Sequence, residues 1–376
     1  MDILGNLNVW GGGLTGWIVP FLFGLTIVVF FHELGHFLVA RWCGVRVLVF
    51  SIGFGPEIFG FNDRHNTRWK LSAIPLGGYV KFFGDDSAAS TPDQASLATM
   101  NEDERRHSFF HQNVWRRAAI VVAGPVANFL LAVVIFSAIA MFYGKPTLSA
   151  RVDTIIPGSA AAEAGIQAGD VITAIDGKPI ATFADMQRIV SGSAGRSLAL
   201  SIDRGGAPVQ LKATPREGKG GFCNGGVLGL SRSQSADDQR TEKMGVGASV
   251  VSAVDHTYLI IDRTLCYLGA LVIGRESADQ LGGPIRIAQV SGQVATMGFT
   301  PVLDLVAGLS VSIGLLNLFP IPLLDGGHLL FYLIEAIRGR PLSERAQEMG
   351  FRVGLAIVVM LMIFATFNDI LHLTRT

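Results

Sequence analysis

The sequence predicts a polytopic α-helical membrane protein with four transmembrane helices and a folded α+β domain inserted between the second and the third. Three observations support this fold class. Of the 376 residues, 49% are apolar and only 16% are Asp, Glu, Lys or Arg, whereas an average soluble domain has about 25% charged residues. Four long stretches contain no charged residue at all. Between two of them lies a segment with the alternating pattern of a small soluble domain.

The net charge and the cysteines exclude several classes of partner and site. Thirty basic and thirty acidic residues give a formal net charge of zero, so no overall field attracts nucleic acid and we expect no nucleic-acid partner. The three cysteines lie far apart without a CxxC pair, which argues against a disulfide framework and against a zinc site built from cysteine. Any metal must therefore be held by histidine or carboxylate.

The four charge-free stretches are long enough to cross a lipid bilayer. A helix needs about 20 apolar residues to cross a hydrocarbon core of about 30 Å. The stretches have 30, 27, 20 and 16 residues, and the last continues past Asp369. The first has no basic residue before it and no small-residue cleavage site after it, so we expect a retained span rather than a signal peptide. The stretches are Ile3–His32, Ala118–Gly144, Leu305–Leu324 and Val353–Asn368.

Basic residues between the spans predict the orientation. Segment 41–117 contains ten Lys and Arg and segment 325–352 contains four, whereas none precedes Trp17 and only Arg375 follows Asn368. Short basic connections stay in the cytoplasm, while long domains are translocated largely regardless of charge. We therefore expect both connections in the cytoplasm. The long segment 145–286 and both termini are expected on the outer side.

The long outer segment starts with the pattern of a small mixed domain. Alternation predicts strands, with Ala150–Ile156 the first, and Phe183–Val190 has helical spacing. Asp176-Gly177 and Arg204-Gly205-Gly206 are typical of tight turns. Beyond this domain, the Gly/Ser-rich stretch Gly218–Asp238 predicts a linker. Val251–Val272 predicts a partly amphipathic helix at the outer membrane interface, in contact with the lipid bilayer.

The first apolar stretch ends on His32-Glu33-Leu34-Gly35-His36. Residues four apart share a helix face, so both imidazoles can reach one metal ion while Glu33 lies beside them. This spacing is the HExxH pattern of zinc proteases. In a soluble helix the pattern is often accidental, with histidines that face water. At the end of an apolar span such side chains are costly to place in lipid, which favours a protein cavity or a metal ion.

A catalytic zinc ion usually has three protein ligands, and the third apolar stretch offers the missing one. Pro320 and Pro322 break a helix just before Asp325. Irregular backbone at membrane depth is tolerated only where it lines a cavity or packs in protein. We therefore predict Asp325 as the third zinc ligand. Two alternatives stay open: Asp325 caps a helix at the interface, or His328 is the ligand in its place.

Together these motifs resemble the site-2 protease family of intramembrane zinc metalloproteases, in particular its bacterial RseP-like regulators of the envelope stress response. The stretch 157–180 resembles a PDZ domain, a fold that binds an extended peptide by strand addition. Its groove would lie between Ala150–Ile156 and Phe183–Val190. Many relatives carry two PDZ domains, and this chain has room for one. The family motifs are HELGH at 32–36, PLGGYVKF at 75–82, GPVANF at 124–129, GGPIRIA at 282–288 and NLFPIPLLDGG at 317–327.

The resemblance implies a zinc-dependent endopeptidase in a bacterial inner membrane, with the PDZ domain on the outer side. Residues Val45–Phe82 would form a membrane re-entrant β-hairpin region that can hold a substrate by main-chain pairing; an ordinary cytoplasmic hairpin is the alternative. Asn317 would clamp the extended substrate through its amide. The substrates would be single-span membrane proteins with weak helices, trimmed first by another protease. A peptide bound in the PDZ groove is also possible.

In this interpretation Zn²⁺ polarises the scissile carbonyl, and Glu33 is the general base that takes a proton from water and later delivers it to the leaving amine. Two other classes of function stay open: a membrane scaffold that binds peptides through its PDZ domain, and a metal transporter with a transit site at His32, His36 and Asp325. The predicted parts are the first span 1–44, the hairpin region and cytoplasmic loop 45–117, the second span 118–144, the PDZ domain 145–216, the linker and interfacial helix 217–300, the third span 301–328, and a loop with the fourth span 329–376.

Overall fold

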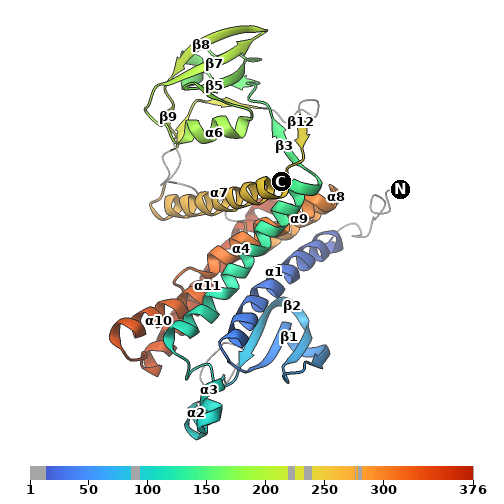
Figure 1. Cartoon of the computed structure of the whole chain (residues 1–376), viewed down its shortest axis with the longest axis vertical. Coiled ribbons are helices and arrows are strands. Elements are labelled where there is room, and N and C mark those ends of the chain that lie inside the picture. Colours follow the sequence, from blue (N-terminus) through green and yellow to red (C-terminus); the bar gives the residue numbers. More distant parts are fainter. Residues whose placement is uncertain are drawn as a thin grey trace, which may run out of the picture. The chain divides into compact units, whose positions relative to one another are not determined.

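A computed structural model describes residues 14–85, 94–218, 225–232, 239–275, 277 and 282–375 (Figure 1). The chain forms two compact units. Unit 1 comprises the described residues of 1–137, 250–261 and 279–376, and unit 2 comprises those of 138–249 and 262–278. The candidate site lies in unit 1, while unit 2 contains the inserted domain.

Four helices in the described part of the chain are long and apolar enough to cross a membrane, which confirms the number predicted from the charge-free stretches. Exposed Trp17 and Trp42 lie near the two ends of the first helix, and tryptophan is typical of membrane–water interfaces. Their separation of 25 positions in the sequence corresponds to about 38 Å of helix, close to the thickness of a bilayer with its headgroups. The four helices are α1 (Leu14–Trp42), α4 (Val114–Phe142), α9 (Phe299–Asn317) and α11 (Glu344–Arg375).

The acidic residue inside the last span has a structural partner. Asp369 is 3% exposed, and its carboxylate accepts hydrogen bonds of 2.8 to 3.0 Å from the backbone N–H groups of Gly283, Ile285 and Arg286. These groups belong to the N-terminus of α8 (Pro284–Thr296), where the helix dipole favours an anion. A Cβ at position 283 would lie 2.6 Å from the carboxylate. Asp369 thus joins α11 to α8, which packs along α1.

An antiparallel hairpin packs against α1 (Figure 1). Its strands, β1 (Val47–Asn62) and β2 (Arg68–Phe82), are longer than the strand patterns within Val45–Phe82 predict. The base of the hairpin is part of the core of unit 1: Phe50 is 1% exposed, and its ring stacks on Trp69 with 4.2 Å between centroids. The rest of the hairpin has several exposed apolar side chains, which indicate a contact with lipid or with another chain. These side chains are Phe54, Ile58, Phe59, Phe61, Leu71, Ile74 and Leu76.

The third membrane-length helix breaks where the prolines predict. α9 ends at Asn317, and α10 (Asp325–Arg338) begins at Asp325. In the intervening segment Leu323 has a φ of 116°, a backbone conformation that is rare for a residue with a side chain. The segment folds back on the first turn of α10 so closely that Gly326 and Gly327 have no room for a Cβ. This break places Asp325 at the start of a new helix.

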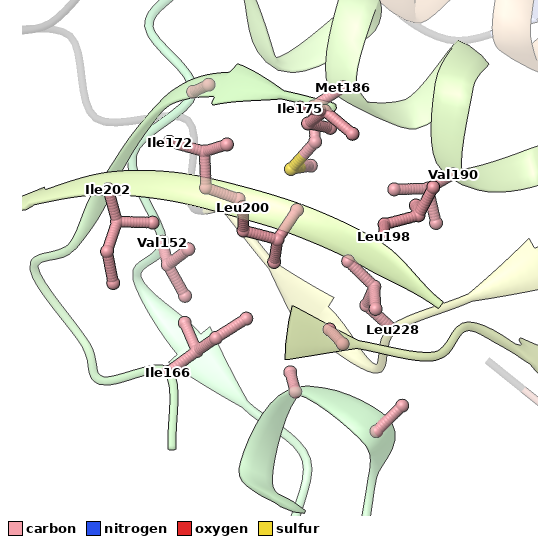
Figure 2. Close-up of a cluster of buried hydrophobic side chains, with 14 residues drawn as sticks. Val152, Ile166, Ile172, Ile175, Met186, Val190, Leu198, Leu200, Ile202 and Leu228 are labelled. Carbon is pink, nitrogen blue, oxygen red and sulfur yellow. The ribbon is translucent and has the colours of Figure 1, made fainter. Parts of the chain in front are cut away.

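Unit 2 is built on a four-stranded antiparallel sheet in the order β6-β5-β7-β8, and Figure 2 shows its apolar core. The two predicted tight turns are confirmed, because Asp176-Gly177 and Gly205-Gly206 all have positive φ. Hydrogen bonds from the Arg204 guanidinium lower the pKa of the buried carboxyl of Asp170. The elements of unit 2 include α5 (Ala160–Glu163), β5 (Val171–Ile175), β6 (Lys178–Pro179), α6 (Phe183–Ser191), β7 (Leu198–Arg204) and β8 (Ala207–Ala213).

The predicted linker Gly218–Asp238 is wrong for its described part, residues 225–232. Here β10 (Gly226–Val227) pairs with β9 (Arg216–Glu217), and β11 (Leu230–Ser231) pairs with β4 (Thr154–Ile155). Leu228 between them is 3% exposed in the core of unit 2. The sequence did not predict these strands, because the segment is rich in Gly and Ser and contains only three apolar side chains.

The same pairing corrects the predicted peptide groove. Each half of the strand Ala150–Ile156 is already paired with its own chain, residues 150–152 with residues 169–172 and residues 153–156 with residues 229–231. In the second half Asp153 N–H donates to Ser231 O and Ile156 N–H to Gly229 O. In the first half Val152 N–H donates to Asp170 O. A peptide therefore cannot add to this strand without displacing residues 229–231.

The predicted interfacial helix forms α7 (Val246–Val272), which is not one of the four candidate spans. Cys266 on this helix is disulfide-bonded, whereas Cys43 is a free thiol and Cys223 lies outside the described residues. The sequence argued against a disulfide framework and gave no indication of the single bond at Cys266. The remaining elements are α2 (Gln94–Thr99), α3 (Glu102–His107), β3 (Lys145–Leu148) and its partner β12 (Gln239–Glu242).

Candidate metal centre and active site

Three side chains converge in unit 1 although they come from different parts of the sequence. His32 and His36 lie one turn apart on α1, with their Nε2 atoms 3.2 Å from each other. Oδ2 of Asp325 lies 3.1 Å from Nε2 of His32 and 3.5 Å from Nε2 of His36. Both histidines are less than 10% exposed. The carboxylate of Asp325 thus faces the imidazoles, and the alternative that it only caps α10 is not needed to explain its position.

A metal ion fits this group of donors. Oδ2 of Asp325 is buried and has no hydrogen-bond partner in the described chain, although two ring nitrogens point towards it. One ligand atom from each residue lies within 4.8 Å of the others. Two imidazoles and one carboxylate are a donor set of catalytic zinc sites, which keep one position open for water or substrate. His328 is not a member of this group, although it lines the same cavity.

A cavity of about 210 Å³ lies in front of the three side chains. Glu33 lines it from α1, and Asn317 lines it from the last turn of α9. β2 passes next to the general-base candidate, because a Cβ at Gly78 would lie 3.0 Å from Cγ of Glu33. All five residues proposed from the sequence therefore meet around one cavity; they are His32, Glu33, His36, Asn317 and Asp325.

Helix α4 contacts both histidines. The sequence pattern did not predict this role of α4. Nδ1 of His36 lies 2.9 Å from Ile120 O, and the amide of Asn128 lies 3.2 Å from Nδ1 of His32. Between these two contacts Gly124 leaves space for the rings, since a Cβ there would lie 2.9 Å from Cε1 of His32 and still closer to His36. The signal in the sequence was a glycine and an asparagine four residues apart in a charge-free span.

A zinc-protease motif on a membrane-length helix, completed by a carboxylate that follows another such helix, defines the class of membrane-embedded metallopeptidases. Comparison with known families makes the assignment specific. The chain belongs to peptidase family M50, which it matches over residues 20–361. Its site lies entirely within the matched region.

Similar proteins cover nearly the whole chain. A protein of Rhizobium meliloti (strain 1021) named "Putative zinc metalloprotease R01501" is 51% identical, over 94% of this chain and 96% of its own length. A protein of Agrobacterium fabrum named "Putative zinc metalloprotease Atu1380" is 49% identical, over 96% and 97%. The metalloprotease MmpA of Caulobacter vibrioides is 40% identical, over 94% and 95%. The family and these names support a zinc metallopeptidase.

The donor set predicts which variants lose metal. His32→Ala, His36→Ala and Asp325→Ala should each reduce the zinc content of the purified protein strongly, because a three-ligand site loses one third of its protein ligands. His328→Ala is the control and should keep its zinc. Metal analysis of the four detergent-purified variants measures this. Zinc lost in His328→Ala and kept in Asp325→Ala would exchange the roles of these two residues.

Proposed function

We propose that this metallopeptidase cleaves single-span membrane proteins within or next to the bilayer. The observation that carries the proposal is the position of the HExxH pair. His32 and His36 lie on a helix long and apolar enough to cross a membrane, and Asp325, just after another such helix, lies 3.1 Å from the first of them. A catalytic cavity between such helices is suited to polypeptide that enters from the membrane rather than from water.

The chemistry we propose assigns His32, His36 and Asp325 as the zinc ligands. Zinc bound there supplies a Lewis acid that polarises the scissile carbonyl and lowers the pKa of water. Glu33, next to His32 and at the wall of the cavity, takes the proton of the attacking water and later delivers it to the leaving amine. The amide of Asn317 can donate to and accept from an extended main chain. The substrate helix must unwind first, because its carbonyls are otherwise hydrogen-bonded within the helix.

The β1–β2 hairpin is the element that we propose holds the unwound substrate, as a membrane re-entrant region. Residues 49–52 of β1 pair with residues 68–71 of β2 on one side and with residues 78–81 on the other, so the outer edges that can pair with an added strand belong to residues 57–62 and 78–82. β2 lies next to Glu33 at Gly78, which brings a paired substrate strand close to the general base. The exposed apolar side chains of the hairpin are compatible with surroundings of lipid and substrate.

The general-base assignment is tested with Glu33→Gln. Parent and variant are reconstituted in proteoliposomes with a single-span protein that carries a helix-destabilising residue in its span. The variant should keep stoichiometric zinc, because Glu33 is not a ligand, and should cleave at least about 100-fold more slowly, as expected for loss of a general base.

Three outcomes with these proteoliposomes would contradict the proposal. A Glu33→Gln variant with full zinc and full cleavage would remove Glu33 from the mechanism. A parent protein that binds the single-span protein without cleaving it would favour the scaffold, and zinc uptake into the vesicles would favour the transporter.

We propose that the hairpin and the segment 325–352 face the cytoplasm of a bacterium, and that unit 2 lies outside the inner membrane. The ten basic residues of segment 41–117 support this orientation. The cysteines support it independently: Cys266 in unit 2 is disulfide-bonded, as is common in oxidising compartments, whereas Cys43 at the end of the first span is a free thiol.

Single cysteines test this orientation. In a variant without the three native cysteines, Glu102→Cys on α3 and Ala207→Cys on β8 introduce thiols at two exposed positions. A membrane-impermeant maleimide added to spheroplasts should label Ala207→Cys at once and Glu102→Cys only after lysis. Labelling in the reverse order would invert the topology.

We propose that unit 2 is a PDZ domain that acts as a size filter, so that a substrate must lose its outer domain to another protease first. Because residues 229–231 pair with β4, a peptide groove would lie between residues 226–231 and α6. Gly226 lies against the end of that helix, where a Cβ would collide with Val190 O. The rival role is recruitment of a trimmed substrate through this groove.

Deletion of the domain separates filtering from recruitment. Residues 150–232 can be removed while β3 and β12, which pair with each other, close the remaining stem. The filter predicts that the shortened enzyme cleaves full-length precursors that the parent rejects, still in a Glu33-dependent manner. Recruitment predicts slower cleavage of trimmed substrates instead. The measurement is cleavage of one substrate, full-length and trimmed, by the parent and by the shortened enzyme. Continued rejection of the full-length substrate by the shortened enzyme would contradict the filter.

A further inference from the structure

Asn128 is a fully buried polar residue in a membrane-length helix. Its residue exposure is 0%, and α4 contains no charged residue after Arg117. Burial of an amide without hydrogen-bond partners is costly, and polar residues at membrane depth generally mark functional or helix-joining contacts. The side-chain contact of Asn128 is with a candidate zinc ligand: its amide lies 3.2 Å from Nδ1 of His32.

The protonation of Nδ1 determines which hydrogen-bond partner His32 needs when it binds a metal ion. A neutral imidazole that binds an ion through Nε2 carries its proton on Nδ1. Ligating histidines donate this proton to a carbonyl, a carboxylate or water, which fixes the tautomer and the ring orientation. His36 already has such an acceptor, since its Nδ1 lies 2.9 Å from Ile120 O. The corresponding neighbour of His32 is Asn128.

The orientation of the amide then follows from the hydrogen-bond network. The atom assigned as the amide nitrogen faces Nδ1 of His32, and Oδ1 has no hydrogen-bond partner among the described residues. The oxygen and nitrogen of such an amide are assigned from their surroundings rather than from their shape. With the proton on Nδ1, a facing N–H group would set donor against donor. Exchange of the two amide atoms places the oxygen 3.2 Å from Nδ1, where it accepts the proton.

We infer that Asn128 is the positioning residue of His32: its side-chain oxygen accepts the Nδ1 proton and holds Nε2 towards the zinc ion. The inference rests on the proposed zinc site and extends it to α4. Ile120, Gly124 and Asn128 are four residues apart and therefore share one face of the helix. This face supplies an acceptor for His36, a gap for both rings and an acceptor for His32.

Helix α9 holds this face of α4 in place. Ser310 Oγ donates a hydrogen bond of 2.8 Å to Asn128 O, and Ser310 is also fully buried. At Gly314 a Cβ would lie 3.1 Å from Cβ of Asn128. The backbone of Asn128 is thus fixed from one side while its side chain reaches the histidine on the other. A side chain so constrained can fix the rotation of the His32 ring.

Two substitutions separate the acceptor from the space that the side chain fills. Asn128→Leu has a similar size and no acceptor, whereas Asn128→Asp accepts through both oxygens and cannot donate. The control Ser312→Ala removes a serine hydrogen bond within α9, to Gly308 O, and leaves the contacts of Asn128 unchanged. The measurement is the zinc dissociation constant of the detergent-purified full chain by chelator competition. The absorption spectrum of the Co²⁺-substituted protein reports the coordination at the same time.

Asn128→Leu should bind zinc about 10 to 100 times more weakly, the usual effect of losing the acceptor of a ligating histidine. Asn128→Asp and Ser312→Ala should bind it about as tightly as the parent, with an unchanged Co²⁺ spectrum. Thermal unfolding of the metal-free proteins shows which variants are folded. If Asn128→Leu does not fold, Asn128→Asp still decides, because it can serve only as an acceptor.

Two results would overturn the inference. One is a folded Asn128→Leu protein with the zinc affinity of the parent. The other is a folded Asn128→Asp protein that loses zinc, which would show that donation by the amide matters. Failure of the zinc site itself has a different signature: His32→Ala would then keep its zinc. Loss of zinc in His32→Ala with unchanged affinity in Asn128→Leu contradicts only the role of Asn128.

Discussion

The structure of unit 1 depends on the convergence of two imidazoles and one carboxylate inside apolar surroundings. Polar groups of this kind are costly to bury unless they are paired, hydrogen-bonded or bound to a metal. Here they face one another, with Oδ2 of Asp325 within 3.5 Å of both ring nitrogens. The break after α9, the close packing of Gly326 and Gly327, and the strained backbone at Leu323 all serve to bring this carboxylate to α1.

Close helix contacts make the same convergence possible from the other side. Membrane helices associate through small residues, because lipid provides no hydrophobic force between them. At Gly35 a Cβ would collide with the backbone of Ala123, and at Gly124 it would collide with the His36 ring. α1 and α4 can therefore approach closely enough for the backbone oxygen of Ile120 to reach His36. The glycines of these helices thus contribute to the geometry of the site as directly as the ligands do.

The sequence predicts those features that are local. The HExxH spacing lies within two turns of one helix, the four spans follow from the absence of charge, and the prolines predict the break before Asp325. Long-range contacts leave no such pattern. Asn128 meets His32 across 96 residues, and the spacing of Gly124 and Asn128 in α4 does not by itself indicate which side chain they meet. The sequence did not indicate the strands in segment 225–232 for a related reason, because the partner strand β4 lies 75 to 77 residues earlier.

Asp325 and Asp369 show how a carboxylate in a candidate metal site differs from a structural one in such a protein. Both are acidic residues in otherwise apolar segments, and both are costly there. The carboxylate of Asp369 accepts three backbone hydrogen bonds at a helix N-terminus and so is satisfied within the protein. Oδ2 of Asp325 has no hydrogen-bond partner in the described chain and faces two ring nitrogens. A cation held between this carboxylate and the two imidazoles satisfies all three groups, and this is the requirement that a zinc ion meets.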